Sequence, residues 1–480
     1  MSSSPEEKKA SQVGPSSHGI TYHSDNKGDT NGTNNHPPAD HQQQQGHCRQ
    51  ASIPKIMKPG AVAETRILLL ENINPVAVKL LTDQGFIVDQ LKASLSEDQL
   101  IQRLRSFEYS GLGIRSKTKV TEKVIKEAGQ KLLVIGCFCI GTNQVDLNAA
   151  ASAGISVFNS PFSNSRSVAE LVIGELVALS RQLTDRSSEL HSGVWNKLSK
   201  GCWELRGKTL GIVGYGHIGS QLSVLAEAMG MKVIYHDVIP IMPLGSARQM
   251  KNLESMLSAA DFVTIHVPEL PETLNLISSK ELKCMKRGSY LINNSRGRVI
   301  DIPALIDAME SGHLAGIALD VFPTEPSGNG PYFDAHLNPW TERLLKLPNT
   351  ILTPHIGGST EEAQQAIGNE VATAIIRYLT LGSTVSAVNF PEVSLRTALE
   401  PGRVRVCHVH HNQRGVLKLI NSIVEDYNVE KQFSDSKGDI AYLLADVQVS
   451  NVSEGSHSEV SELFKRISST ESNIKTRILY

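Results

Sequence analysis

Beyond about residue 60, the apolar residues of this 480-residue chain form short continuous runs with amphipathic stretches between them. The run at 66–70 has four apolar residues after its arginine, which is typical of a strand buried on both faces. A helical pattern then starts at Asn74 and Pro75. Further strands are expected at 85–88, 109–114 and 132–135. Because helical stretches separate these strands, the pattern predicts an α/β domain with a parallel sheet.

A second series of strands and helices begins at Thr209. Most of its apolar runs are followed by a turn signal and a helical pattern, so we expect a second Rossmann-like, doubly wound parallel sheet. Its expected strands are 209–213, 232–235, 262–266, 290–293, 316–320 and 350–352.

The residues after 404 follow a different pattern. Residues 404–410 alternate like a strand, and 415–425 are helical. A strand at 438–446, a helix at 458–467 and a short strand at 475–480 follow. This βαββαβ order predicts a small ferredoxin-like α+β unit at the end of the chain.

Residues 1–60 have almost no apolar side chains and are rich in Ser, Asn, Gln, His, Gly and Pro. Such a segment buries too little surface to offset its ordering entropy. We therefore expect a disordered, low-complexity tail.

Composition and charge narrow the possible partners and compartments. The formal net charge is -2, so no basic bias indicates nucleic acid or an anionic membrane surface as a partner. No apolar run has the length needed to cross a bilayer, and the N-terminus lacks the apolar core of a secretory signal. Six cysteines in a chain of this length form no disulfide framework. We expect a cytoplasmic protein with reduced cysteines.

A glycine-rich turn follows the strand at 209–213 and opens a helical pattern, which is the context that a dinucleotide-binding GxGxxG motif requires. Gly214 permits the tight turn, Gly216 lets the backbone approach a pyrophosphate, and Gly219 lets the helix pack on the strand. The helix N-terminus offers unpaired N–H groups to the phosphates. The next strand ends at Asp237, where an acid binds the ribose 2′-hydroxyl and disfavours a 2′-phosphate. The predicted cofactor is therefore NAD.

Three side chains with suitable chemistry lie just after successive strands of this second unit. Alcohol oxidation by hydride transfer needs a base for the hydroxyl proton, a cation for the substrate carboxylate, and a group that orients the base. His355 is the candidate base, Arg296 the candidate cation, and Glu325 the candidate partner that raises the pKa of His355. The carboxyl ends of strands form the ligand crevice of open α/β sheets, so we expect the three to converge.

The order of these motifs resembles the D-isomer-specific 2-hydroxyacid dehydrogenases, and within them the D-3-phosphoglycerate dehydrogenases of the bacterial and fungal type. The resemblance covers roughly 60–480 and rests also on segments 136–146, 161–170, 193–197, 301–305 and 386–394. It implies NAD-dependent oxidation of 3-phosphoglycerate to 3-phosphooxypyruvate, the first step of phosphorylated L-serine biosynthesis, with Arg296, Glu325 and His355 as the catalytic set. Further cofactor contacts implied by the resemblance are His217, Ile218, Asn294, Ser295, Asp320, Gly357 and Gly358.

The substrate phosphate needs a cationic pocket of its own. Arg115 and Ser116 follow a strand of the first domain, on the side that faces the cleft in this fold, and are the candidates. By similarity, Trp195 and Lys197 reach into the site of a neighbouring subunit. The resemblance also implies a homotetramer.

The implied domains are a discontinuous substrate-binding domain, an NAD-binding Rossmann domain and a regulatory ACT domain. In related enzymes an ACT domain binds L-serine between paired copies, at positions that match His410, Asn412 and Asn428. Feedback inhibition by serine is therefore the hypothesis, although Arg414 replaces the proline usual in that turn. Alternation along the strand divides the nearby cysteine and histidines between two faces, so we predict no metal site. The expected boundaries are 61–163 with 358–398, 164–357, and 404–480.

Two other functions remain open at this point. The catalytic trio also suits the reduction of another 2-oxo acid, such as 2-oxoglutarate, hydroxypyruvate or glyoxylate. A corepressor-like binding protein that senses NAD(H) is the alternative of another class. The cationic pocket and the ACT-like unit favour the phosphorylated substrate, and a turnover assay separates enzyme from binding protein.

Overall fold

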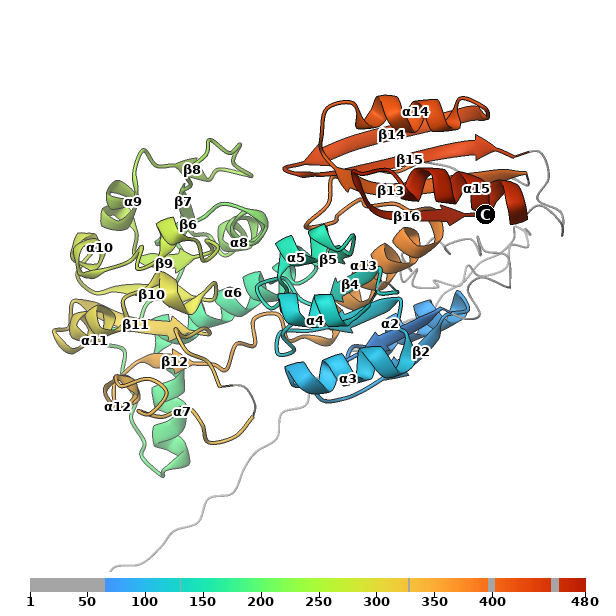
Figure 1. The fold of residues 1–480 in the computed structure, drawn as a ribbon. Helices are drawn as coiled ribbons and strands as arrows, with labels where there is room; N and C mark the ends of the chain where they lie inside the picture. Colours follow the sequence, from blue (N-terminus) through green and yellow to red (C-terminus); the bar gives the residue numbers. More distant parts are fainter. Residues whose placement is uncertain (1–64, 130, 327–328, 396–401, 450–456) are drawn as a thin grey trace, which may run out of the picture. The chain divides into compact units, whose positions relative to one another are not determined.

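The computed structural model describes residues 65–129, 131–326, 329–395, 402–449 and 457–480 (Figure 1). The predicted tail at 1–60 lies outside these residues. None of the helices in the described part of the chain is long and apolar enough to span a bilayer.

The first sheet has five parallel strands in the order β2-β1-β3-β4-β5. The expected strands at 85–88, 109–114 and 132–135 each begin two residues later than predicted, and β5 was not predicted. The helix expected at Asn74 is present, and the Asn74 side chain accepts a hydrogen bond from the Val76 N–H as its N-cap. The strands are β1 (Arg66–Leu69), β2 (Ile87–Gln90), β3 (Gly111–Ile114), β4 (Val134–Cys137) and β5 (Ser156–Phe158), and the helices α2 (Pro75–Asp83), α3 (Glu97–Phe107), α4 (Glu122–Glu127) and α5 (Leu147–Ser152).

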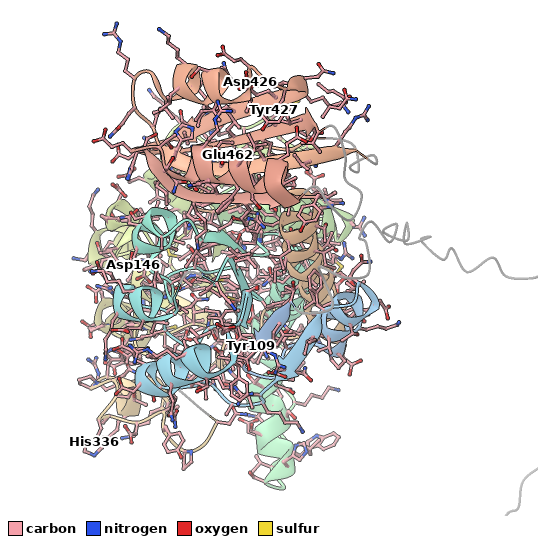
Figure 2. The ribbon with its side chains drawn as sticks, turned by 45° about the vertical axis from the view of Figure 1, so that its right-hand side comes forward. Tyr109, Asp146, His336, Asp426, Tyr427 and Glu462 are labelled. Atoms are coloured by element: carbon pink, nitrogen blue, oxygen red, sulfur yellow. The ribbon has the colours of Figure 1, made fainter. Side chains whose placement is uncertain are left out.

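A partly buried hydrogen bond links β2 to the segment just before β3. Tyr109, labelled in Figure 2, lies just before β3 and donates a hydrogen bond of 2.5 Å from its hydroxyl to Asp89 of β2. Burial, together with the Asp89 carboxylate, raises the pKa of Tyr109 to about 12, so the phenol stays protonated and remains a donor.

The second sheet has seven parallel strands in the order β12-β11-β10-β9-β6-β7-β8. The chain runs from β6 to β7 on one side and returns to β9 on the other, so the strand order reverses between β6 and β9. Its strands are β6 (Thr209–Val213), β7 (Lys232–His236), β8 (Arg248–Gln249), β9 (Phe262–Ile265), β10 (Ser289–Asn293), β11 (Leu314–Leu319) and β12 (Thr350–Leu352). Its helices are α6 (Ser165–Arg181), α7 (Leu183–His191), α8 (His217–Ala228), α9 (Leu253–Ala259), α10 (Ser279–Cys284), α11 (Ile302–Glu310) and α12 (Thr341–Leu344).

One long helix, α13 (Glu361–Leu381), carries the chain back to the first sheet. It packs against α2 and β4, and Ala387 beyond it pairs with Phe158 of β5. At its N-terminus, Thr360 caps the helix and hydrogen-bonds Ser167 of α6 at 2.8 Å.

The C-terminal unit is a four-stranded antiparallel sheet in the order β14-β15-β13-β16, which confirms the predicted βαββαβ order. One face packs against two helices, and the other shares a hydrophobic core with α13 and Phe390. The elements are β13 (Arg403–His411), α14 (Val416–Val424), β14 (Asn428–Lys437), β15 (Ile440–Gln448), α15 (His457–Ser468) and β16 (Asn473–Leu479).

Candidate active site

The glycine turn joins β6 to α8 at the reversal of the strand order. Gly214 has φ +90°, and a Cβ there would lie 2.8 Å from the His266 carbonyl oxygen, so this position requires glycine. Gly219 packs so closely that a Cβ would collide with the Gly214 carbonyl. At Gly216, by contrast, a Cβ would meet none of the described atoms within 4 Å, and no side chain caps the helix there. The start of α8 therefore has no side-chain cap and no described atom crowding Gly216, which suits an anion-binding helix N-terminus.

Asp237 follows β7 beside this turn. Its carboxylate accepts hydrogen bonds from the N–H groups of Tyr215 at 2.8 Å and Ile239 at 3.3 Å. These bonds hold the acid over the start of the glycine turn, where a ribose attached to a bound pyrophosphate would come. His217 and Ile218 form the first turn of α8, and the His217 ring stacks on Phe162 with centroids 3.6 Å apart.

The candidate catalytic side chains come from three strand ends. His355 Nδ1 lies 2.8 Å from Glu325 Oε2, and the other Glu325 oxygen accepts the Phe322 N–H at 3.2 Å. The hydrogen bond to Glu325 raises the pKa of His355 above its usual value, against an opposing effect of burial. Burial alone would raise the pKa of Glu325, but His355 and Arg296 keep it below its usual value.

Arg296 completes the set. Its guanidinium donates a 2.7 Å hydrogen bond to the Ser295 carbonyl, and Asn293 holds the Arg296 carbonyl at 2.9 Å. The charge of Arg296 contributes to the pKa values of both His355 and Glu325, so the three residues share one electrostatic environment. The structure thus brings together a base, its carboxylate partner and a cation.

Asp320 is one of the predicted cofactor contacts, and its carboxylate also accepts hydrogen bonds from the protein itself. Its oxygens accept from Thr353 Oγ1 at 2.6 Å, the Ile356 N–H at 2.8 Å and the Gly357 N–H at 2.7 Å. This buried carboxylate fixes the turn that presents His355, whose φ is +55°. Gly358 packs against the side chain of Asn164 on α6.

A buried acid bonded to Asn294 was not predicted from the sequence. The Asn294 amide donates a 2.9 Å hydrogen bond to Glu175 of α6, and both side chains are buried. Burial raises the pKa of Glu175 to about 8, with Asn294 opposing and Asp320 adding to the shift. An acidic residue on the apolar face of α6, beside Val172 and Leu176, was the available signal. The neighbouring Ser295 hydroxyl donates to Asn293 at 2.7 Å.

The candidate phosphate-binding residues lie at the end of β3. Arg115 is half-buried and Ser116 is exposed. Gln144 donates a 2.6 Å hydrogen bond to the Arg115 carbonyl, and the Cys139 thiol lies 3.5 Å from the same oxygen. Burial raises the pKa of Cys139 to about 11, while Arg115 and Arg296 both act to lower it. Both arginines therefore influence the same thiol, although they follow strands of different sheets.

Two of the predicted site residues, Trp195 and Lys197, were expected to reach the site of a neighbouring subunit. Trp195 and Lys197 lie in an exposed segment after α7, and Trp195 is 82% exposed. None of the residues of α7 is buried. The contact of Trp195 and Lys197 with a neighbouring subunit stays a prediction.

The candidate effector residues are also separated. Asn412 donates to the Gly438 carbonyl beyond the end of β13, and Asn428 donates to Gln448, which pairs with Arg403 at the start of β13. At roughly 3.3 Å per residue along a strand, the two asparagines lie at opposite ends of the sheet. His410 is buried, and burial lowers its pKa. Among the described residues no group of three His, Cys, Asp or Glu side chains is arranged to hold a metal ion, and the absence of a metal stays a prediction.

Known proteins share both the sequence and the fold. Residues 173–357 match the model of the D-isomer specific 2-hydroxyacid dehydrogenase NAD binding domain. D-3-phosphoglycerate dehydrogenase 2 of Saccharomyces cerevisiae is 55% identical over 438 residues, 90% of this chain and 92% of the yeast protein. D-3-phosphoglycerate dehydrogenase of Dictyostelium discoideum is 52% identical over 415 residues, 86% of this chain and 97% of that protein. An NAD-complexed D-isomer specific 2-hydroxyacid dehydrogenase from Lactobacillus delbrueckii ssp. bulgaricus matches with a TM-score of 0.58 and 26% identity, over 66% of this chain and 97% of that one.

Proposed function

This chain belongs to the D-isomer-specific 2-hydroxyacid dehydrogenase family and is an NAD-dependent oxidoreductase, and on that premise we propose that it oxidises 3-phosphoglycerate to 3-phosphooxypyruvate. This reaction is the first step of phosphorylated L-serine biosynthesis. The observation that carries the proposal is the His355–Glu325 pair, 2.8 Å apart, in the electrostatic environment of Arg296.

The turn after β6 fits NAD. The uncapped start of α8 and the open space over Gly216 suit a pyrophosphate, and Asp237 suits an unphosphorylated ribose. Bound there, NAD would accept the hydride from the substrate carbon that bears the hydroxyl. We also assign to the cofactor site the residues that the family resemblance implied: His217, Ile218, Asn294, Ser295, Asp320 and the turn at 355–358.

The chain's own residues handle the proton and the charge. Neutral His355 accepts the hydroxyl proton at Nε2, and the resulting imidazolium is stabilised through Nδ1 by the Glu325 carboxylate. Arg296 binds the substrate carboxylate and polarises the developing carbonyl. Arg115 and Ser116 bind the phosphate at the other end of the substrate, and Trp195 and Lys197 of a neighbouring subunit close that site. An exposed loop with these two residues supports an oligomer, for which we propose a tetramer.

The test is NADH production at 340 nm with 3-phosphoglycerate and NAD at alkaline pH. Turnover with 3-phosphoglycerate at a kcat/KM well above that for D-glycerate and D-2-hydroxyglutarate supports the proposal. Preference for an unphosphorylated acid would move the assignment to another member of the family. NADH binding without turnover of any hydroxy acid would favour a corepressor-like role.

The C-terminal sheet is proposed to be an ACT domain that binds L-serine between two chains. Because Asn412 and Asn428 occupy opposite ends of one sheet, a site formed by both requires a second copy placed antiparallel to the first. Inhibition by serine that disappears in Asn428→Ala, with the serine-free kcat unchanged, would support this assignment. Serine-insensitive turnover in the wild type would contradict the effector and point to Arg414.

We propose the domain limits 61–163 with 358–398, 164–357 and 404–480, in accord with the three sheets and the return of α13 to the first sheet. The five described cysteines are unpaired, which suits the reducing conditions of the cytosol that we propose as its location.

A further inference from the structure

Glu71 is a buried acid directly after β1 that the reaction described above does not use. Its two carboxylate oxygens accept hydrogen bonds from the backbone N–H groups of Lys117 at 2.9 Å and Thr118 at 2.7 Å. The side chain is 7% exposed. Both bonds reach the turn that begins with Arg115 and Ser116, so an acid just beyond the end of β1 holds the backbone of the candidate phosphate-binding turn.

The backbone around Glu71 is strained in a way that serves this contact. Glu71 has φ +64° and Asn72 has φ +54°, two consecutive residues in the left-handed region that L-residues other than glycine avoid. Strain of this kind persists where the surrounding structure holds it, and it concentrates at functional sites. Here the left-handed turn places the carboxylate next to the turn that follows β3.

The position of this contact in the first sheet is the position of a ligand site. The chain passes from β1 to β2 on one side of the sheet and continues from β3 on the other, so the strand order reverses between β1 and β3. In open α/β sheets ligands bind at the carboxyl ends of the strands at such a reversal. Glu71 and Arg115 stand at these two strand ends.

The opposite side of the same turn is held as well. Gln144 and Cys139 hydrogen-bond the Arg115 carbonyl, at 2.6 Å and 3.5 Å. The turn is therefore held at the Arg115 carbonyl and at the N–H groups of Lys117 and Thr118. None of these contacts uses the side chain of Arg115, Ser116 or Lys117. The turn can therefore direct these three side chains toward a ligand.

From this arrangement we propose that Glu71 is a positioning residue that gives the enzyme its preference for a phosphorylated substrate. It acts through the backbone of Lys117 and Thr118, which aims Arg115 and Ser116 at the phosphate. The inference rests on the proposed function, because it assumes that the turn at 115–118 binds the substrate phosphate.

The decisive variant is Glu71→Gln, which keeps the shape of the side chain but replaces one acceptor oxygen with an NH2 group facing an N–H. We expect KM for 3-phosphoglycerate to rise about 10-fold or more, because a misplaced binding group weakens a charge-assisted contact. The kcat should stay within about 2-fold of wild type, and kcat/KM for unphosphorylated D-glycerate should not change, because Arg296 and His355 remain in place. Inorganic phosphate should also become a weaker competitive inhibitor.

The controls separate positioning from general stability. Glu122→Gln removes an exposed carboxylate from α4 of the same domain and should leave both substrates unaffected. In an Arg115→Ala background, Glu71→Gln should cause little further loss, since Glu71 acts through that turn. Glu71→Asp, which keeps the charge but shortens the reach, should show the same selective rise in KM if the glutamine variant does not fold.

The outcomes are distinct from those of the functional proposal. A wild type that fails to oxidise 3-phosphoglycerate overturns the function itself. A wild type that oxidises it, together with a Glu71→Gln enzyme that has unchanged KM or equal losses on both substrates, overturns the role of Glu71 and leaves the function in place.

Discussion

The strand ends of the seven-stranded sheet and the C-terminal antiparallel sheet both contain histidines, but in opposite electrostatic environments. His355 is half exposed, and the Glu325 carboxylate raises its pKa. His408 of β13 is fully buried beside Thr476, and burial lowers its pKa to about 3. One imidazole can gain and lose a proton near neutral pH, whereas the other stays neutral.

The charged groups of the two regions differ in the same way. Arg296 keeps part of its surface accessible at the site, while Arg405 of β13 is completely buried and makes two hydrogen bonds to Asp446, at 2.6 Å and 2.8 Å. A cationic side chain that binds a substrate needs N–H donors that the substrate can reach. A buried cationic side chain that stabilises a sheet needs a protein hydrogen-bond partner for each of its donors. The environment of a residue, more than its type, separates the reactive region from the structural one.

The largest effect is expected from His355→Ala. Loss of the general base should lower kcat by about 10³-fold, within the range typical of acid–base catalysis. The matched control is His336→Ala, an exposed histidine between Glu325 and His355 that is labelled in Figure 2. Steady-state rates at 340 nm measure both, and a His355→Ala enzyme within 10-fold of wild type would remove His355 from the mechanism.

The next effect concerns stability. Asp446→Asn should lower the free energy of unfolding by about 3 kcal/mol, because it leaves the buried Arg405 charge without its counter-ion. Urea denaturation measures the change, and Asp426→Asn, which breaks an exposed pair with Arg466, should give a much smaller one. If kcat of folded Asp446→Asn fell as it does in His355→Ala, the contrast between the two regions would be wrong.

A smaller effect is expected from Glu325→Gln, and it should depend on pH. The neutral amide stabilises the imidazolium less well, so the maximal rate should fall by about 10- to 100-fold. His355 must be neutral to accept a proton, so oxidation rises as pH passes upward through its pKa. Removing the carboxylate lowers that pKa, and the acidic limb of the pH profile should move to lower pH. An acidic limb that stays in place would assign it to another group.

Much of the fold and of the candidate site was predictable because it depends on local sequence. Apolar runs located most of the strands, and the glycine spacing located the turn after β6, since both follow from backbone geometry within a few residues. The ten-residue β14 was missed, because most of its side chains are exposed and it contains no apolar run. Arg296, Glu325 and His355 could be paired in advance because parallel strands share one carboxyl edge. The first residues of β2, β3, β4 and β11 differ from the expected ones by two positions, because periodicity does not mark the first hydrogen bond of a strand.

Contacts between distant segments were decided by the tertiary structure alone. No sequence pattern identified the partners of three buried acids: Asp320 accepts from the turn of His355, Glu175 from Asn294, and Glu71 from the turn of Arg115. These carboxylates bond residues from 33 to 119 positions away, so their partners are set by strand order and packing. The sequence by itself determined which elements form and which chemical groups stand at their ends, because those depend on neighbours along the chain. Only the fold decided which groups are fixed by hydrogen bonds and which remain free to react. Burial and hydrogen-bond partners come from segments that lie far apart along the chain.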